Sequence, residues 1–250
     1  MVFRNSSELI DKLRKMREIG FGSQGTAYYD PITKKVYKIF FYAYEEDFEE
    51  DEDTLYKESE LLKFKDISND TVIFPKESII VKDEIVGYIT PFVEGKNLDR
   101  IAPLKINYNS FLMASEVALR DIEKLSYDKV AMYDVIYNTM YKDGSLKIID
   151  TDEFSYSSKS IEEINQDNMY FFNTGLILFL TYGLFEEFIQ SNSKLSSLYS
   201  DKKDIITFLK VFRDRLSKKV GKEIITLEDA SSCLNKHKIK DKRNRFIRNY

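Results

Sequence analysis

Several residue types are scarce in this chain of 250 residues, and each scarcity excludes a class of protein. The single cysteine, Cys233, has no partner for an internal disulfide, and the single histidine, His237, cannot build a zinc site. A disulfide scaffold, a Cys/His metal cluster and a thiol redox pair are therefore excluded. Because His237 lies in a charged tail among lysines, we expect any acid–base chemistry to use carboxylates.

Long apolar runs are also missing. The N-terminus lacks the apolar stretch of a secretory signal. The most apolar run, residues 169–185, is interrupted by Asn173 and Thr174 and is shorter than the ~20 residues that span a bilayer, so it predicts a buried helix. We therefore expect a cytoplasmic protein without a transmembrane segment. A net charge of -4 disfavours nucleic acid as a partner, because proteins that bind nucleic acid are usually basic.

The chain nevertheless has the composition of a folded protein, with 43% hydrophobic residues, which is too many for a disordered chain. Hydrophobic periodicity predicts strands near 17–29, 35–41, 77–81 and 85–93, and helices over 6–17, 54–65, 111–125, 167–185, 203–217 and 227–234. A β-hairpin is predicted over 139–149, around Lys142-Asp143-Gly144. We predict an α+β protein with a small β-rich lobe, residues 1–93, and a larger helical lobe, residues 94–250. A cleft between such lobes is a common place for a ligand.

Three glycines, Gly20, Gly22 and Gly25, form a G-x-G-x-x-G pattern between two predicted strands. A dinucleotide-binding fingerprint requires a helix after the glycines, whereas Thr26-Ala27 here begins a strand. The absence of Gly-Lys-Ser/Thr excludes a Walker-type loop. A glycine-rich hairpin can fold over phosphates, because its N–H groups approach without obstruction by Cβ atoms. The alternative is that the glycines are only turn residues.

Three polar residues follow in a suggestive order later in the chain. Asp134 and Asn138 precede the predicted hairpin, and Asp150 ends its apolar second strand. Phosphoryl transfer needs a carboxylate near the attacking hydroxyl and oxygen ligands for Mg²⁺. Together with the glycine-rich turn, this order resembles the protein-kinase-like superfamily, including its atypical and aminoglycoside-phosphotransferase-like members. The resemblance covers residues 17–185 and implies a bilobal kinase-like fold that binds ATP and Mg²⁺.

The resemblance implies roles for residues of the first lobe. The glycine-rich hairpin, Gly20 to Gly25, would cover the phosphates, and Ala27 would lie against the adenine. Lys38 would pair with the α- and β-phosphates. Glu58 best matches the helix glutamate that orients this lysine, and Glu60 is its rival.

The resemblance also implies a hinge and a catalytic loop. Thr90 would be the gatekeeper, and the main chain of Pro91 and Val93 would meet the adenine edge. In the second lobe, Asp134 would be the base that orients the hydroxyl. Asn138 and Asp150 would hold the metal.

The chain departs from the family pattern at several positions. Met132-Tyr133 replaces the usual His-Arg, and Asp134 and Asn138 are four positions apart where the family usually has five. Asp150-Thr151-Asp152 replaces Asp-Phe-Gly, so Asp152 is either a second metal ligand or the start of the following loop. Only about 17 residues separate Asp150 from the apolar helix, too few for a full activation segment that docks a peptide.

The sequence therefore predicts a kinase, an ATP- and Mg²⁺-dependent phosphotransferase acting on a hydroxyl, with a protein serine or threonine slightly favoured over a small molecule. A pseudokinase that binds nucleotide as a scaffold is the second interpretation. A third is nucleic-acid binding through residues 236–248, which carry seven Lys/Arg and one acidic residue. Eight of the nine residues 45–53 are acidic, and we interpret this run as a solvated loop. No oligomeric state is predicted.

Overall fold

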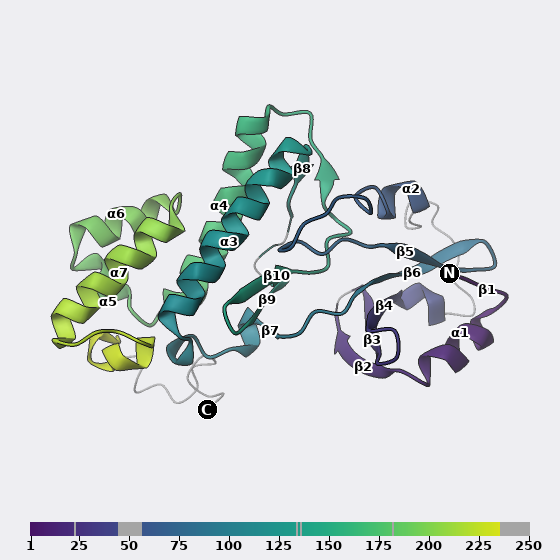
Figure 1. The fold of residues 1–250 in the computed structure, drawn as a ribbon, viewed down its shortest axis with the longest axis horizontal. Coiled ribbons are helices and arrows are strands. Elements are labelled where there is room, and N and C mark those ends of the chain that lie inside the picture. The colour runs from purple at the N-terminus through teal and green to yellow at the C-terminus, as the bar shows by residue number, and fades with distance from the viewer. Residues whose placement is uncertain (23, 45–56, 134, 136, 182, 236–250) are drawn as a thin grey trace. The chain divides into compact units, whose positions relative to one another are not determined.

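The computed structural model describes residues 1–250 except 23, 45–56, 134, 136, 182 and 236–250 (Figure 1). The chain is 45% helical and 23% strand, and its largest sheet is mainly antiparallel, which confirms the predicted α+β class. It divides into two compact units. The N-terminal unit consists of Met1–Asn69, Ile73–Glu94 and Asp150–Asp152, and the C-terminal unit of Asp70–Val72, Gly95–Ile149 and Glu153–Tyr250.

The N-terminal unit is built on a six-stranded sheet in the order β1-β5-β6-β4-β3-β2. Its strands are β1 Val2–Phe3, β2 Arg17–Phe21, β3 Gly25–Asp30, β4 Lys35–Phe40, β5 Glu77–Val81 and β6 Glu84–Pro91. Only β1 pairs in parallel, with β5. All but β1 were predicted, because β-branched and aromatic residues concentrate in these segments. The two residues of β1 are too few to produce an alternating pattern.

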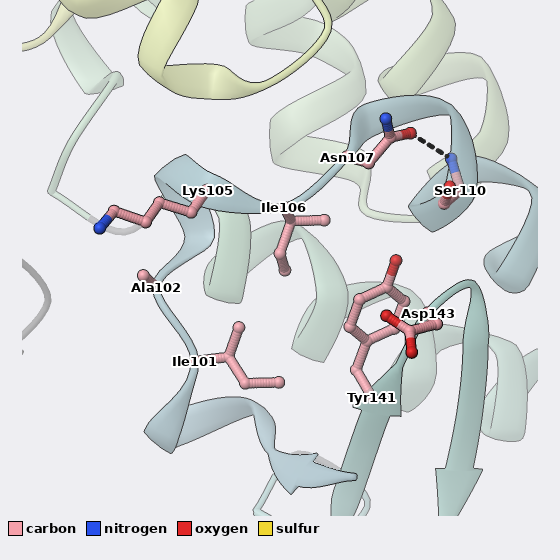
Figure 2. A pocket seen from close by; sticks show the side chains of 8 residues that line it. All are labelled: Ile101, Ala102, Lys105, Ile106, Asn107, Ser110, Tyr141 and Asp143. Carbon is pink, nitrogen blue, oxygen red and sulfur yellow. Dashed lines mark hydrogen bonds between the residues drawn. The ribbon is translucent and has the colours of Figure 1, made fainter.

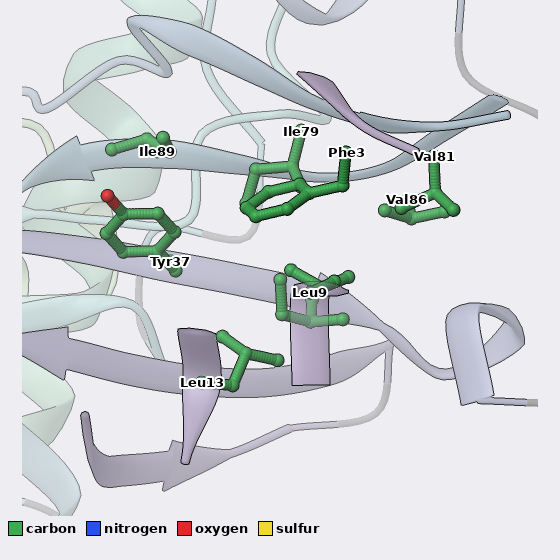
Figure 3. Close-up of a cluster of buried hydrophobic side chains, with 9 residues drawn as sticks. Phe3, Leu9, Leu13, Tyr37, Ile79, Val81, Val86 and Ile89 are labelled. Atoms are coloured by element: carbon green, nitrogen blue, oxygen red, sulfur yellow. The ribbon is translucent and has the colours of Figure 1, made fainter. Parts of the chain in front are cut away.

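One face of this sheet carries the main core of the unit. Helix α1, Ser6–Leu13, begins where the Asn5 side chain accepts a hydrogen bond from the Glu8 N–H at 3.0 Å. Leu9 and Leu13 lie one helical turn apart and point toward the sheet (Figure 3). They contact a buried cluster of Phe3, Tyr37, Ile39, Ile79, Val81, Val86 and Ile89.

The opposite face of the sheet carries a smaller core and the side chains of the candidate site. Because side chains alternate along a strand, Tyr37 and Ile39 of β4 lie on the first face and Lys38 and Phe40 on the second. Phe40 is buried there with Leu61, Ile85 and Tyr88. Leu61 ends helix α2, Glu58–Leu61, which is shorter than the predicted helix over 54–65. Residues 62–66 form turns, and 54–56 lie outside the described residues.

The C-terminal unit is mainly helical. Its α-helices are α3 Tyr108–Tyr127, α4 Ile161–Thr181, α5 Glu186–Gln190, α6 Ser193–Asp201 and α7 Ile205–Val220, and its short 3-10 helices are η2 Leu98–Arg100, η3 Pro103–Lys105 and η4 Leu227–Cys233. Helices α3 and α4 run side by side (Figure 1). The longer helices were predicted, whereas α5, α6, η2 and η3 were not. Segment 227–234 was predicted as a helix and is mostly the 3-10 helix η4.

The predicted hairpin is present and is formed by β9, Thr139–Lys142, and β10, Ser145–Ile148. Asp143 and Gly144 have φ values of 44° and 85°, the two positive values that a type I′ turn requires. The strand β7, Lys96–Asn97, adds to β9, and β8, Val130–Ala131, pairs with β11, Ser155–Tyr156. Asp150 follows the end of β10 by two residues.

The apolar run of residues 169–185 falls largely within α4, where Phe172, Leu176, Ile177 and Leu180 are buried. No helix in the described part of the chain combines the length and the apolar character that crossing a bilayer requires.

Candidate functional site

The glycine-rich turn joins β2 to β3, as its sequence predicts, and the Gly22 N–H donates to the Gly25 carbonyl at 3.0 Å. A Cβ atom at Gly25 would lie 2.1 Å from the carbonyl oxygen of Ile39, so the packing of β3 on β4 demands glycine there. At Gly20 and Gly22 a Cβ would meet nothing closer than 3.9 Å. The protein's own packing therefore does not require these two glycines, and their open surroundings suit the approach of a ligand to the backbone.

A row of directly opposed residues crosses five strands of the sheet. Its members are Gly20 of β2, Ala27 of β3, Lys38 of β4, Tyr88 of β6 and Ser78 of β5. Residues directly opposite one another in a sheet point to the same face. The register therefore brings three predicted site residues, Gly20, Ala27 and Lys38, into one line. Tyr88 and Ser78 extend this line and were not predicted.

Lys38 is the cation at the centre of this row, and its side chain is only 12% exposed. Its Nζ forms an ion pair with Asp150 and lies 3.5 Å from Oδ1 of Asp152. It also donates to Oε1 of Gln24, in the glycine-rich turn, at 3.0 Å. The structure thus joins two predicted site residues, Lys38 and Asp150, that are 112 positions apart in the chain.

Tyr88 lies beneath this ion pair. Its hydroxyl contacts Oδ1 of Asp150 at 2.7 Å and Oδ1 of Asp152 at 3.2 Å, and the Lys38 Nζ lies 5.4 Å from its ring centroid. Burial raises the pKa of Tyr88 well above its usual value, and the charges of Asp152 and Asp150 add to the effect. Tyr88 is therefore a neutral phenol whose O–H donates a hydrogen bond to the carboxylates.

The two carboxylates differ in their surroundings. The Asp150 side chain is 35% exposed, whereas that of Asp152 is 1% exposed. Burial acts to raise the pKa of Asp150, but the charge and hydrogen bond of Lys38, together with the hydrogen bonds to Tyr88 and Asp152, hold that pKa below its usual value. Burial raises the pKa of Asp152, and the neighbouring charge of Asp150 adds to the rise against the influence of Lys38. Asp150 is thus the ionised, accessible partner and Asp152 the internal one.

The backbone around Asp150 is held in an unusual conformation. Its φ of 59° lies in the left-handed region, which costs a residue other than glycine roughly 1–2 kcal/mol. On one side, the Ile148 N–H donates to the Thr71 carbonyl at 2.8 Å and the Ile149 N–H to the Asn138 carbonyl at 3.0 Å. On the other side, the Thr151 hydroxyl donates to the Ile73 carbonyl at 2.9 Å. Strained residues fixed in this way concentrate at functional sites.

Glu58, which the resemblance makes the partner of Lys38, has a different contact. Its carboxylate accepts a hydrogen bond from the hydroxyl of Ser78, the last member of the row. The partners of Lys38 among the described residues are Gln24, Asp150 and Asp152, and neither Glu58 nor Glu60 is one of them. The structure therefore does not bring Glu58 and Lys38 together.

The predicted hinge begins where β6 ends, at Pro91. The Phe92 N–H donates to the Lys34 carbonyl at 3.0 Å. The centroid of the Phe92 ring lies 4.2 Å from the centroid of the Tyr29 ring. In contrast, the backbone of Val93 forms no hydrogen bond with any residue that the structure describes. A purine edge needs one backbone donor and one acceptor, and Val93 has both available.

The predicted catalytic loop belongs to the C-terminal unit, and Asp134 lies outside the described residues. Asn138 is half-buried, and its carbonyl is fixed by Ile149 as described above. The start of the loop is held by Asn168 of α4, whose side chain accepts from the Met132 N–H and donates to the Val130 carbonyl, both at 2.9 Å. Asn168 was not predicted. Its signal is a buried polar residue on an otherwise apolar helix face.

A pocket of about 430 Å³ lies elsewhere in the C-terminal unit (Figure 2). Ile101, Ile106 and the Tyr141 ring give it an apolar wall, with the Asp143 carboxylate beside them, while the Lys105 side chain points away. Its size suits a small molecule. None of the predicted site residues lines it.

No group of three His, Cys, Asp or Glu side chains that could hold a metal ion exists among the residues that the structure describes. No family model matches the sequence, and no curated protein matches it either. A functional assignment therefore depends on the residues and their geometry.

Proposed function

We propose that the chain is an ATP- and Mg²⁺-dependent phosphotransferase that acts on a hydroxyl. The observation that carries the proposal is the ion pair between Lys38, on the sheet beside the glycine-rich turn, and Asp150, in a strained backbone two residues after β10. A lysine for phosphate oxygens and a carboxylate for the metal that neutralises them are the two charges this reaction needs close together. Gly20 and Ala27 lie in the same row of the sheet as Lys38.

The donors fit Mg²⁺ together with a nucleotide. Magnesium is commonly held by one or two carboxylates plus substrate phosphates and retains several waters, so a site formed by three protein ligands is not required. Asp150 is ionised and accessible, and it would be the first ligand, with Asn138 as the second. The buried position of Asp152 favours an internal role over a second metal ligand. Bound Mg²⁺ would neutralise the phosphate charge, and ATP would supply the phosphoryl group.

The proposed acceptor is a hydroxyl oriented by Asp134. A serine or threonine of a protein is slightly favoured over a small molecule, because a chain of 250 residues leaves little room for an elaborate metabolite pocket. The short segment after Asp150 favours the small molecule instead. Mass spectrometry of the protein incubated with Mg-ATP, alone and with a generic protein substrate, would separate the two acceptors.

A pseudokinase that binds nucleotide without turnover is the second candidate. The observation that favours it is the pairing of Glu58 with Ser78 and not with Lys38, together with Met132-Tyr133 in place of His-Arg. The presence of Lys38, Asp134 and Asp150 in one chain favours the enzyme, because phosphoryl transfer uses a cation for phosphate oxygens, a carboxylate for the metal and a carboxylate near the attacking hydroxyl.

The test is the melting temperature with ATP, with and without Mg²⁺, and phosphate transfer measured in parallel. We expect Mg-ATP to raise the melting temperature of the wild type more than ATP with a chelator does, and we expect slow hydrolysis. Asp150→Asn should abolish the difference that Mg²⁺ makes. Asp83→Asn is the matched control, because Asp83 also has a positive φ, 69°, in the same unit but lies exposed in a turn. Stabilisation without turnover would indicate the pseudokinase, and no nucleotide effect at all would refute both candidates.

A further inference from the structure

The Tyr88 side chain contacts Asp150 and Asp152 through its hydroxyl and Lys38 through its ring. It is 3% exposed, stands opposite Lys38 in the paired strands β4 and β6, and contacts the Phe40 ring at a centroid distance of 5.9 Å. Its position on a central strand fixes the backbone, and only two side-chain torsions remain to place the hydroxyl. A group on such a rigid element is held more firmly than one on a loop or on a four-carbon lysine side chain.

The Tyr88 hydroxyl and the Lys38 ammonium group contact the same two carboxylate oxygens. Tyr88 lies within hydrogen-bond distance of Oδ1 of Asp150 and Oδ1 of Asp152, and Lys38 contacts these two oxygens as well. The two donors and two acceptors therefore form a closed arrangement. Within this arrangement, Asp152 and Tyr88 restrict the orientation of the Asp150 carboxylate, which is the more exposed of the two carboxylates.

We propose that Tyr88 is a positioning residue, whose hydroxyl orients the Asp150 carboxylate toward Lys38 from the sheet. In the protein-kinase-like pattern an ordering role belongs to a helix glutamate that acts on the lysine, but here Glu58 is bonded to Ser78. Lys38 and Asp150 are thus ordered by β6 through Tyr88 and not by α2. This inference rests on the proposed function where it concerns turnover, and on the described contacts alone where it concerns the orientation of Asp150.

The matched pair of variants is Tyr88→Phe and Tyr37→Phe. Each removes one hydroxyl from a buried tyrosine of the same sheet, but Tyr37 faces the opposite core with Leu9 and Ile79. In protein labelled with ¹³C at the aspartate carboxyl carbons, Tyr88→Phe should shift the signals of both Asp150 and Asp152, whereas Tyr37→Phe should leave both in place. This measurement needs no nucleotide. Unchanged Asp150 and Asp152 signals in Tyr88→Phe would overturn the inference.

The second measurement is the rate of phosphate transfer as a function of Mg²⁺ concentration. Removing a group that orients a metal ligand typically costs 10–100-fold in metal affinity or activity. We expect Tyr88→Phe to raise the Mg²⁺ concentration for half-maximal rate by about 10-fold or more. The KM for ATP at saturating Mg²⁺ should change little, because the lysine remains. A general loss of folding would instead lower the active fraction at every Mg²⁺ concentration without moving the midpoint.

The outcomes distinguish the inference from the proposed function. If the wild type transfers phosphate and Tyr88→Phe has the wild-type Mg²⁺ midpoint, the positioning role is wrong and the phosphotransferase stands. If the wild type neither binds Mg-ATP nor transfers phosphate, the phosphotransferase is wrong. The carboxyl signals then decide by themselves whether Tyr88 orients Asp150.

Discussion

At the scale of single residues, Lys38 has a structural role beside its proposed role toward phosphates. Its ammonium group contacts two aspartate side chains, one of them almost completely buried. Removing one partner of a buried ion pair costs about 3–5 kcal/mol, and solvent screening at the partly exposed Asp150 reduces that cost.

We therefore predict that Lys38→Met folds at neutral pH but is less stable by about 2 kcal/mol, measured by urea denaturation. Since Lys38 holds the pKa of Asp150 below its usual value, this stabilisation is present at neutral pH and is lost as the pH falls through the lowered pKa. The difference between the two proteins should consequently shrink in acid. Lys35→Met is the control, because Lys35 pairs with Glu77 and its side chain is 40% exposed. A difference that grows in acid would contradict the prediction.

Asp150 and Asp134 have different proposed roles, so variants of the two residues should differ in whether they lose nucleotide binding or only phosphate transfer. Asp150→Ala removes a charged metal ligand, so the Mg²⁺-dependent part of ATP binding and turnover should both fall. Asp134→Asn keeps the shape and most nucleotide contacts, so binding should survive while transfer drops by roughly 10²–10⁴-fold, as for a positioned general base. Calorimetric titration of Mg-ATP with transfer rates measured in parallel decides between them. Wild-type transfer by Asp134→Asn would show that Asp134 is not the base and that the catalytic-loop alignment is wrong.

At the scale of elements, α2 is attached to the sheet by one polar contact and one apolar side chain. Glu58 accepts from the buried hydroxyl of Ser78, and Leu61 enters the small core with Phe40. A helix of four residues has little stability of its own, so these contacts hold it in place.

We predict that Ser78→Ala and Glu58→Ala each lower the free energy of unfolding by about 1 kcal/mol. The double variant should lose less than the sum of the two, because each change already removes the same hydrogen bond. Chemical denaturation of the wild type, the two single variants and the double variant gives the four free energies of unfolding that this double-mutant cycle requires. Additive losses would show that Glu58 does not stabilise the fold through Ser78.

The elements that could be predicted are those with a strong repeating pattern. The strands β2 to β6 alternate or concentrate β-branched residues, α3 and α4 carry long apolar periodicity, and Asp143-Gly144 is the residue pair that a type I′ turn needs. Among the elements that were missed, β1, β7 and α5 have two to five residues, which is too few to establish a period. Helix α6 was missed although it has nine residues, because Leu195 is the one buried residue among these nine described positions and the apolar pattern is weak.

The candidate site could be predicted only in part, for a similar reason. Ala27 and Lys38 were predicted from their positions after the glycine-rich turn in the pattern that the chain resembles, and Asp150 from its place after an apolar strand. Tyr88, Gln24 and Asn168 became visible only when the register and the hydrogen bonds were known, because each acts through residues distant in the chain. In the structure Glu58 contacts Ser78 and not Lys38. Both residues are 20 positions from Glu58 in the chain, so sequence separation does not distinguish these two partners.

At the scale of the whole molecule, charge is distributed unevenly along the chain. Residues 45–53 carry eight acidic side chains and residues 236–248 carry seven basic ones, and both segments lie outside the described residues. With a net charge of -4, the chain as a whole repels polyanions, so the acidic run opposes any attraction by the basic segment.

We predict that deleting residues 45–53 leaves ATP hydrolysis nearly unchanged but creates affinity for polyanions. The deletion changes the net charge from -4 to +4, because it removes eight acidic residues and no basic one. Retention on heparin at low ionic strength should increase and should disappear with added salt, since exposed charges are screened over about 10 Å at 0.1 M. A second deletion, of residues 236–250, made in the same background tests whether the basic segment is responsible, and it should abolish the retention.

A large loss of hydrolysis in the first deletion would show instead that the acidic run helps to place the helix that carries Glu58. Retention that persists without residues 236–250 would exclude the basic segment as the route to nucleic acid.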